Sequence, residues 1–231
     1  MGGSVTRAWF CPYVLRERGC GGMTDDAVPR LARFRPGTVD DVERLLVIQF
    51  QSPSREAVTM AGSAAAAKAF RAALLMRTLS NDTAEVIVLE FDDDPVGFAE
   101  LSTEGDMPPL TIVAGTAIRS MGFMGALTAG WRSLARSRVE IKAPDGLHIV
   151  ELQVAPEHRN KGFGALLLGE IERQARERHA PALSLTTAID NPSRHLYERS
   201  GFTVELEKRN RRYESITGSP GRVLMVKRLT T

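Results

Sequence analysis

The feature that most constrains this 231-residue chain is an apolar run that ends at a proline and leads into a glycine-containing turn. Residues 148–154 are rich in β-branched and apolar side chains, which is typical of a buried strand. Pro156 ends the run because proline has no N–H to donate to a sheet ladder. Beyond the turn, apolar residues recur at helical spacing and predict a helix over residues 162–178.

The turn between this strand and helix has the composition of an anion-binding loop. Gly162 and Gly164 let the backbone approach a ligand closely, and Arg159 and Lys161 add positive charge. The free N–H groups of the first helical turn, together with the helix dipole, favour an anion at this point. We interpret the turn as a cradle for a phosphate or pyrophosphate, with a helix start that simply needs small residues as the alternative.

Two common phosphate-binding motifs are excluded. The dinucleotide fingerprint requires glycine or alanine at its sixth position, which counted from Gly162 is Leu167. The P-loop ends in Gly-Lys-Ser/Thr, whereas Lys161 precedes its glycine and no hydroxyl residue follows.

Composition excludes other classes of function. Thirty basic and 28 acidic residues give a net charge of +2, and no basic block with interleaved aromatics suggests a nucleic-acid surface. Cys11 and Cys20 form no cluster with metal-ligand spacing, so we expect no metal and a cytoplasmic protein without disulfides. The alanine-rich segment is interrupted by Lys68, Arg71 and Arg77, and the apolar segment over residues 110–131 is interrupted by Arg119. We therefore expect no membrane span.

The remaining pattern predicts one domain over residues 31–231 behind a poorly ordered tail, residues 1–30. Thr38 is a candidate N-cap and Ser54 begins a second helix. Gly201 suits the left-handed cap of a short helix. The expected strands are residues 31–35, 85–91, 96–102, 148–154, 183–187, 202–206 and 222–229, and the expected early helices are residues 39–49 and 54–79.

Residues 104–145 interrupt this regular order. Phe123, Leu127, Trp131 and Leu134 recur at three- and four-residue spacing and therefore share one helix face. We expect a helical insertion at about residues 104–146 that is buried, lid-like or a homodimer surface.

Two segments together resemble a known family. Arg159-x-x-Gly162-x-Gly164 after a Val-x-Pro strand end resembles motif A of the GCN5-related N-acetyltransferases (GNAT), and DNPSRHLYERSGF at residues 190–202 resembles motif B. The resemblance covers residues 33–229 apart from the insertion. It implies an α/β (α+β) fold with a mixed, mostly antiparallel sheet and helices on both faces.

The resemblance also implies a binding site for acetyl-CoA as co-substrate. In this family the cofactor enters a gap between two central strands, and strand backbone pairs with its pantetheine arm. The motif-B asparagine of the family, Asn191 here, contacts pantetheine, although it stands one position short of the common spacing from Tyr197. The implied backbone contacts are Leu152, Gln153 and Val154 for pantetheine, and Arg159, Asn160, Lys161, Gly162, Phe163, Gly164 and Ala165 for pyrophosphate.

Catalysis in such a site needs a base for the amine and an acid for the leaving thiolate. Tyr197 stands where the family places the acid, with a core aromatic as the alternative. Glu151 is the first candidate base and His148 the second, and strand alternation puts these two on opposite faces unless a bulge intervenes. Deprotonation through water, with neither residue essential, is the alternative.

The expected function is therefore acetyl transfer to a primary amine by direct attack in a ternary complex. The acceptor is a small molecule or a peptide, and the sequence does not choose between them. A non-catalytic acyl-CoA sensor and a transferase of longer acyl groups are the alternatives.

Overall fold

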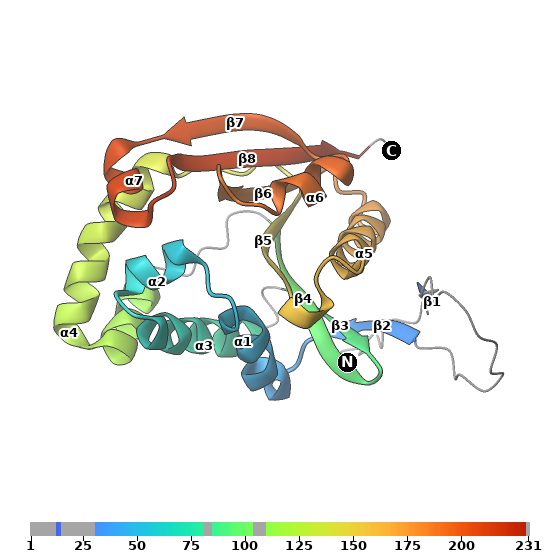
Figure 1. Ribbon diagram of the computed structural model, residues 1–231, viewed down its shortest axis with the longest axis horizontal. Helices are drawn as coiled ribbons and strands as arrows, with labels where there is room; N and C mark the ends of the chain where they lie inside the picture. Colours follow the sequence, from blue (N-terminus) through green and yellow to red (C-terminus); the bar gives the residue numbers. More distant parts are fainter. Residues whose placement is uncertain (1–12, 15–30, 81–84, 104–109, 230–231) are drawn as a thin grey trace, which may run out of the picture.

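The computed structural model describes residues 13–14, 31–80, 85–103 and 110–229 of the chain (Figure 1). Its centre is one sheet in the order β1-β2-β3-β4-β5-β6-β8-β7, in which β5 and β6 are parallel and the other described neighbours are antiparallel. The strands are β1 Tyr13–Val14, β2 Leu31–Pro36, β3 Glu85–Phe91, β4 Asp94–Thr103, β5 Leu147–Val154, β6 Ala182–Ala188, β7 Thr203–Arg209 and β8 Gly221–Arg228.

Helices cover both faces of the sheet, as the sequence predicts. The α-helices are α1 Val42–Phe50, α2 Arg55–Ala61, α3 Ala64–Ser80, α4 Leu110–Arg136, α5 Phe163–Glu177, α6 Arg194–Arg199 and α7 Arg211–Thr217. Short 3-10 helices are η1 Val39–Asp41, η2 Ser137–Val139 and η3 Pro156–His158.

The two faces have separate apolar cores. On one face, α5 packs Leu167 and Ile171 against Ile149 and Leu183, and Tyr197 of α6 joins this cluster. On the other face, α1 and α3 pack Leu45 and Leu75 against Val88 and Phe98. Burying apolar side chains on both faces fixes the sheet between the two helical layers.

The helix predicted for residues 54–79 is wrong as a single element. Ser54 caps α2 as expected, accepting a hydrogen bond from the Ala57 N–H at 3.1 Å. Gly62, with φ of +89°, ends α2, and the Ser63 hydroxyl then accepts the Ala66 N–H at the start of α3. A left-handed glycine followed by a serine cap produces a corner that apolar periodicity does not reveal.

The sequence pattern also missed α7. Its cap is Asn210, whose side-chain oxygen accepts the N–H groups of Arg212 and Tyr213. Only Tyr213 and Thr217 of this helix are buried, so the apolar signal along it is weak.

The insertion forms α4, a helix kinked at Gly122, where φ is +74°. It lies against α2, α3 and α7. The predicted shared face exists, but Phe123 is 69% and Trp131 60% exposed. Of the three alternatives expected for the insertion, the buried one is therefore wrong for this face. Residues 104–109 of the insertion, together with the tail outside Tyr13 and Val14, lie outside the described residues.

The start of α1 depends on a buried carboxylate. Asp41 is 7% exposed and accepts hydrogen bonds from both terminal nitrogens of Arg35 at 2.7 Å. It also accepts the Thr38 N–H at 2.8 Å and the Thr38 hydroxyl at 3.0 Å. Burial opposes ionisation of Asp41, but these hydrogen bonds outweigh it and lower its pKa.

Replacing Asp41 with alanine should lower the free energy of unfolding by about 2–3 kcal/mol, because it leaves the Arg35 guanidinium and the Thr38 N–H without this partner. Chemical denaturation of the purified variant measures this. Asp40→Ala is the matched control, since Asp40 is exposed in the same turn. An equal loss in both variants would contradict the role given to Asp41.

Candidate active site

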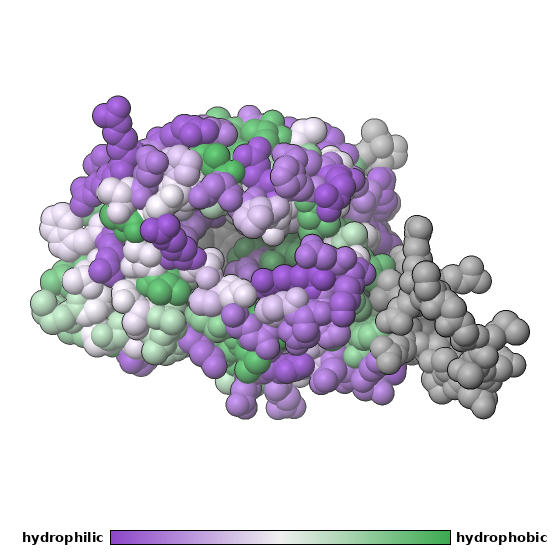
Figure 2. Space-filling model, viewed as in Figure 1, coloured by the Kyte–Doolittle hydropathy of each residue, from purple (hydrophilic) through white to green (hydrophobic). Residues whose placement is uncertain are grey.

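The site begins where β5 and β6 separate. The two strands pair only from Leu147 to Ile149 on β5 and from Leu183 to Leu185 on β6. The β4–β5 ladder nevertheless continues to Val154, and the β6–β8 ladder to Ala188. The second half of β5 therefore has a backbone edge toward β6 without a strand partner among the described residues. Figure 2 shows the surface hollowed over this part of β5, between α1 and α6.

A β-bulge sets which side chains of β5 share a face. Glu151 lies opposite Glu100, and Ile149 lies opposite Leu101, so Val150 is the extra residue. His148 lies opposite Ser102. The bulge therefore brings His148 and Glu151 to the same face, and the alternation of a regular strand, which separates them, does not apply.

Glu151 is the central polar side chain on this face. Its Oε2 accepts the Gln49 Nε2–H at 3.0 Å, and its Oε1 accepts the Gln153 Nε2–H at 2.7 Å. Burial raises the pKa of Glu151, and the charge of Arg71 and the Gln153 hydrogen bond reduce that rise. The result is a carboxylate held by two amides, with a pKa above the ordinary value for glutamate.

Tyr197 lies on α6, beside the open part of β5. It is 7% exposed, and its ring meets Phe202 edge-on at 6.2 Å between centroids. Burial, with the nearby charge of Glu151, raises the pKa of Tyr197 to about 12. The hydroxyl therefore keeps its proton at neutral pH and can act as a donor.

His148 is on the same face but has a different environment. Its Nδ1 lies 2.9 Å from the Ser184 hydroxyl of β6. Burial, with the charge of Arg222, lowers the pKa of His148 to about 4. The imidazole is therefore neutral at physiological pH and linked to β6.

The proposed anion cradle has two residues in left-handed conformation. Asn160 has φ of +60° and Gly162 φ of +92°, and α5 begins directly afterwards. Arg159 donates from Nε to the Val154 carbonyl at 3.0 Å, which ties the turn to the end of β5. The first N–H groups of α5 lack intrahelical acceptors and are available to an anion.

The two glycines of the turn have different structural requirements. A Cβ on Gly162 would meet no atom within 4 Å, so its φ is what favours glycine there. A Cβ on Gly164 would lie 2.8 Å from a methyl of Leu196, so Gly164 also permits α5 and α6 to pack closely.

The motif-B asparagine is already engaged within its own turn. Asn191 donates from Nδ2 to the Thr187 hydroxyl at 2.6 Å, and its Oδ1 accepts the Ser193 N–H at 2.9 Å. These contacts stabilise the turn between β6 and α6.

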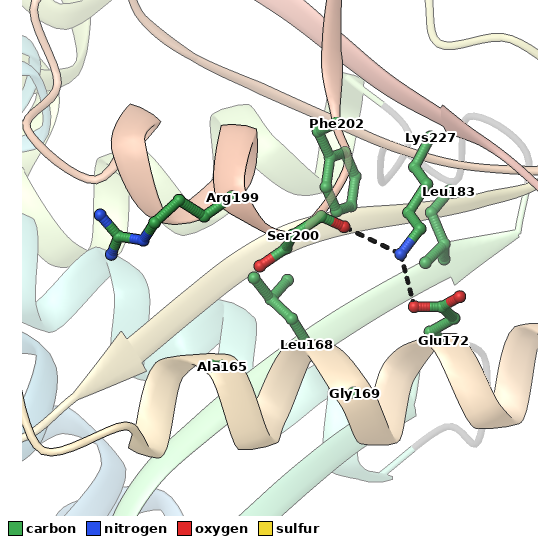
Figure 3. A pocket seen from close by; sticks show the side chains of 9 residues that line it. All are labelled: Ala165, Leu168, Gly169, Glu172, Leu183, Arg199, Ser200, Phe202 and Lys227. Atoms are coloured by element: carbon green, nitrogen blue, oxygen red, sulfur yellow. Dashed lines mark hydrogen bonds and ion pairs between the residues drawn. The ribbon is translucent and has the colours of Figure 1, made fainter.

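A cavity of about 280 Å³ lies between α5 and α6, beyond the cradle (Figure 3). Lys227 of β8 donates to Glu172 at 2.6 Å and to the Ser200 carbonyl at 2.8 Å. These bonds connect β8, α5 and the end of α6 near Leu183, at the end of β6 that is paired with β5.

Sequence reasoning missed the polar residues that the helices bring to the face of Glu151. Gln49 comes from α1 and Arg71 from α3, and Arg71 also pairs with Glu100 at 2.5 Å. A glutamine and an arginine on amphipathic helices resemble ordinary surface residues, so no motif identifies them.

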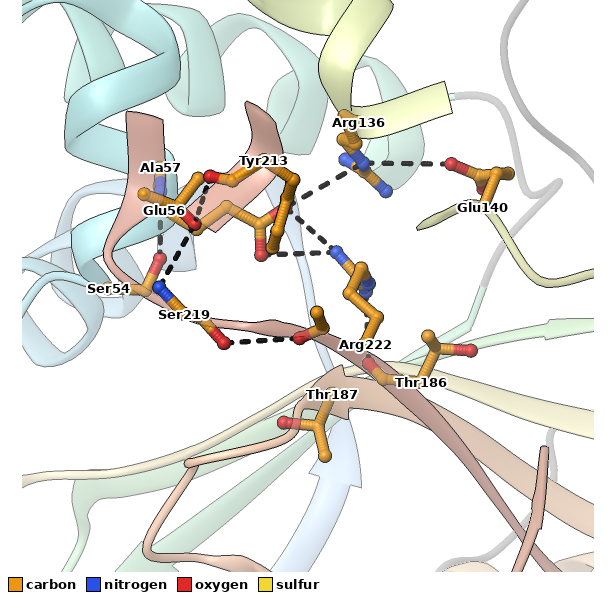
Figure 4. A network of polar contacts seen from close by, with 12 residues as sticks. Ser54, Glu56, Ala57, Arg136, Glu140, Thr186, Thr187, Tyr213, Ser219 and Arg222 are labelled. Carbon is orange, nitrogen blue, oxygen red and sulfur yellow. Dashed lines mark hydrogen bonds and ion pairs between the residues drawn. The ribbon is translucent and has the colours of Figure 1, made fainter. Parts of the chain in front are cut away.

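Arg222 of β8 was missed for the same reason. Its Nη1 binds both carboxylate oxygens of Glu56 at 2.9 and 3.1 Å, and its Nη2 donates to the Thr186 carbonyl (Figure 4). Arg136 of α4 lies 3.7 Å from the same glutamate. This network fastens α2 and the insertion to the sheet beside the site.

Within the described parts of the chain, no group of three or more His, Cys, Asp or Glu side chains is arranged to hold a metal ion. Nor is any helix of the described ranges long and apolar enough to cross a membrane.

Comparison with solved structures relates this geometry to known folds. An arylalkylamine N-acetyltransferase like 5b from mosquito has a TM-score of 0.56 at 18% identity, covering 86% of this chain and 100% of the other. The PaiA N-acetyltransferase from Thermoplasma acidophilum, solved with coenzyme A, has a TM-score of 0.52 at 17% identity, covering 86% of this chain and 99% of the other. At these identities the similarity shows the fold.

Sequence comparison is more specific over part of the chain. The streptothricin acetyltransferase of Streptomyces lavendulae is 34% identical over 119 residues, which are 50% of this chain and 57% of that protein. The match thus spans little more than half of the relative. The family model described as the acetyltransferase (GNAT) family matches residues 56–202, which include both motifs and most of the site. The chain therefore belongs to the acetyltransferase (GNAT) family.

Proposed function

We propose that this protein transfers an acetyl group from acetyl-CoA to a primary amine by direct attack in a ternary complex. The observation that carries the proposal is the position of Glu151 on the strand whose edge is open. It is a half-buried carboxylate that accepts hydrogen bonds from two amides of the described residues. The anion cradle lies at the end of that strand and Tyr197 beside it.

The residues present fit the cofactor. The free edge at Leu152, Gln153 and Val154 can pair with the amides of the pantetheine arm, in the manner of strand addition. The N–H groups of the turn and of the first turn of α5, residues 159–165, would receive the pyrophosphate. When bound, acetyl-CoA supplies a thioester as the activated acyl group.

Glu151 would act as the base. An ammonium group has no lone pair, so it must lose a proton before it can attack a carbonyl. The raised pKa of Glu151 makes it a stronger base, and brings its pKa closer to that of the ammonium group. The amides of Gln49 and Gln153 hold the carboxylate in place. Its negative charge would also attract the protonated amine.

Tyr197 would act as the acid. Its hydroxyl keeps its proton at neutral pH because its pKa is raised to about 12. It is thus available to donate a proton to the departing thiolate.

We favour a small-molecule amine as the acceptor, because the relative with 34% identity is a streptothricin acetyltransferase. A peptide amine and a longer acyl group are the competing substrates, and a cytoplasmic location remains an expectation from the sequence. A non-catalytic acyl-CoA sensor has the same cradle but does not require Glu151 and Tyr197.

Acetyl-CoA at about 100 times its dissociation constant should stabilise the protein by about 2.7 kcal/mol, which raises the melting temperature by roughly 5–10 °C. Gly162→Val should abolish this shift because valine is strained at φ of +92° and the turn must rearrange. Gly169→Ala on α5 is the control, since a Cβ there meets nothing within 4 Å. Absence of a shift with any acyl-CoA would reject the cofactor.

The catalytic roles are tested by measuring thiol release with a panel of small amines. Glu151→Gln should lower kcat by about 10²- to 10⁴-fold, and Tyr197→Phe should lower kcat with little change in acetyl-CoA binding. Glu43→Gln, an exposed change on α1, should match the wild type. Acetyl-CoA binding without turnover of any amine would favour the sensor.

We also infer that the exposed face of α4 binds a second copy of this chain. Five large apolar side chains lie within one face of the helix after Gly122. Together they expose an apolar surface on the order of 500 Å². This area is close to the ~600–800 Å² that each partner buries in a standard interface. A two-fold axis would place this face against itself. The residues are Phe123, Met124, Leu127, Trp131 and Leu134.

Light scattering after size exclusion should therefore give about twice the 25.3 kDa of one chain. Trp131→Asp should give the monomer, because it places a charge in the centre of the apolar face. Val204→Asp changes an exposed apolar residue of β7 and should leave the dimer intact. A wild-type protein that stays monomeric at tens of micromolar would overturn the inference.

A further inference from the structure

We propose that Arg71 is a positioning residue of the active site. It orients the Gln49 amide toward Glu151 and neutralises Glu100, so that of these two facing carboxylates Glu151 is the one left to receive a proton. This inference rests on the proposed function, because it assigns its consequence to the base. A chain of hydrogen bonds runs from α3 through α1 to β5.

The first step is the orientation of Gln49. Arg71 Nε lies 3.1 Å from Gln49 Oε1, and Gln49 Nε2 lies 3.0 Å from Glu151 Oε2. A guanidinium can only donate hydrogen bonds, and an ionised carboxylate can only accept them. The side-chain amide between them therefore has one satisfactory orientation, with its oxygen toward Arg71 and its nitrogen toward Glu151.

The second step concerns Glu100, which lies directly opposite Glu151 across β4 and β5. Arg71 Nη2 binds Glu100 Oε2 at 2.5 Å, and the Thr78 hydroxyl donates to its other oxygen at 3.3 Å. The negative charge of Glu100 raises the pKa of Glu151. Arg71 gives the two carboxylates different environments. Glu100 is the ion-pair partner of Arg71, whereas Glu151 is bound by neutral amides.

Arg71 is well placed to hold this geometry. Its side chain is 16% exposed and that of Glu100 is 8% exposed, so water screens their interaction weakly. The Arg71 side chain donates hydrogen bonds to both Gln49 and Glu100. Thr78, on the same helix as Arg71, donates a further hydrogen bond to Glu100. Loss of Arg71 would free the Gln49 amide to rotate and leave Glu100 without its cation.

Several other groups around Glu151 also affect its titration. Glu100 raises its pKa, whereas Arg71 and Arg222 lower it. His148 on the same face is neutral above about pH 4, and Tyr197 is neutral below about pH 12. Removing Arg71 therefore removes one of two cations that favour the ionised base, and the pKa of Glu151 should rise.

The test is the pH dependence of kcat/KM for an amine that the wild type accepts. A base must be ionised to work, so activity rises with pH through the pKa of Glu151. The rising part of the pH profile at low pH is its acid limb. In Arg71→Met this acid limb should move to higher pH by about one unit, which is the size of shift that one nearby opposite charge produces. Gln49→Met keeps the cation but removes the oriented amide, and should move the limb in the same direction by a smaller amount.

Arg71→Met also leaves Glu100 buried and unpaired, which could impair folding. The double variant Arg71→Met with Glu100→Gln removes both charges and avoids that problem. Because the charge of Glu100 then no longer opposes ionisation of Glu151, the acid limb of the double variant should lie between those of the wild type and the single variant. Arg77→Met is the matched control on the same helix, since Arg77 is exposed, and its profile should be that of the wild type.

The outcomes distinguish this inference from the proposed function. If Glu151→Gln retains the acid limb, Glu151 is not the base and both are rejected. If Glu151→Gln loses the limb but Arg71→Met and Gln49→Met keep it at the wild-type pH, only the positioning role is rejected. An equal shift in Arg77→Met would also reject it. The chain of contacts is supported if Glu151→Gln removes the acid limb of the pH profile and if Arg71→Met and Gln49→Met both move that limb to higher pH.

Discussion

The interaction on which this structure depends is the unequal pairing of β5. The strand bonds to β4 along its length but to β6 only from Leu147 to Ile149. Each backbone group must find a hydrogen-bond partner or remain accessible. The unpaired edge is therefore kept open to the surface hollow, between cores that hold the sheet from both sides. Under the proposed function, this opening would give the acyl donor a backbone partner.

The bulge at Val150 gives this edge its chemistry. It rotates the start of the strand so that His148 and Glu151 share a face, opposite Ser102 and Glu100. Buried charge on such a face is costly unless it is paired. Two helices and β5 itself supply the compensation: Arg71 of α3 pairs with Glu100, and the amides of Gln49 on α1 and Gln153 on β5 hold Glu151. The raised pKa of Glu151, the proposed base, thus depends on side chains from several elements.

The sequence predicted the fold class, through its two family motifs, and the central strand-turn-helix, because each depends on neighbours in the chain. It did not predict the corner at Gly62, where a capping choice overrides an apolar pattern, or α7, which buries little. Gln49 and Arg71 could not be recognised for a different reason. Their role exists only once α1 and α3 lie over β5.

The strand, glycine-containing turn and helix of residues 148–178 follow from the sequence alone, since hydrophobic period, proline and glycine act locally. The sequence also determined that Glu151 lies on the strand and that α4 has one apolar face. Only the tertiary structure decided that Glu151 and His148 face the same side and that the α4 face is exposed. Register shifts, long-range ion pairs and burial arise from packing between distant segments, which no local pattern encodes.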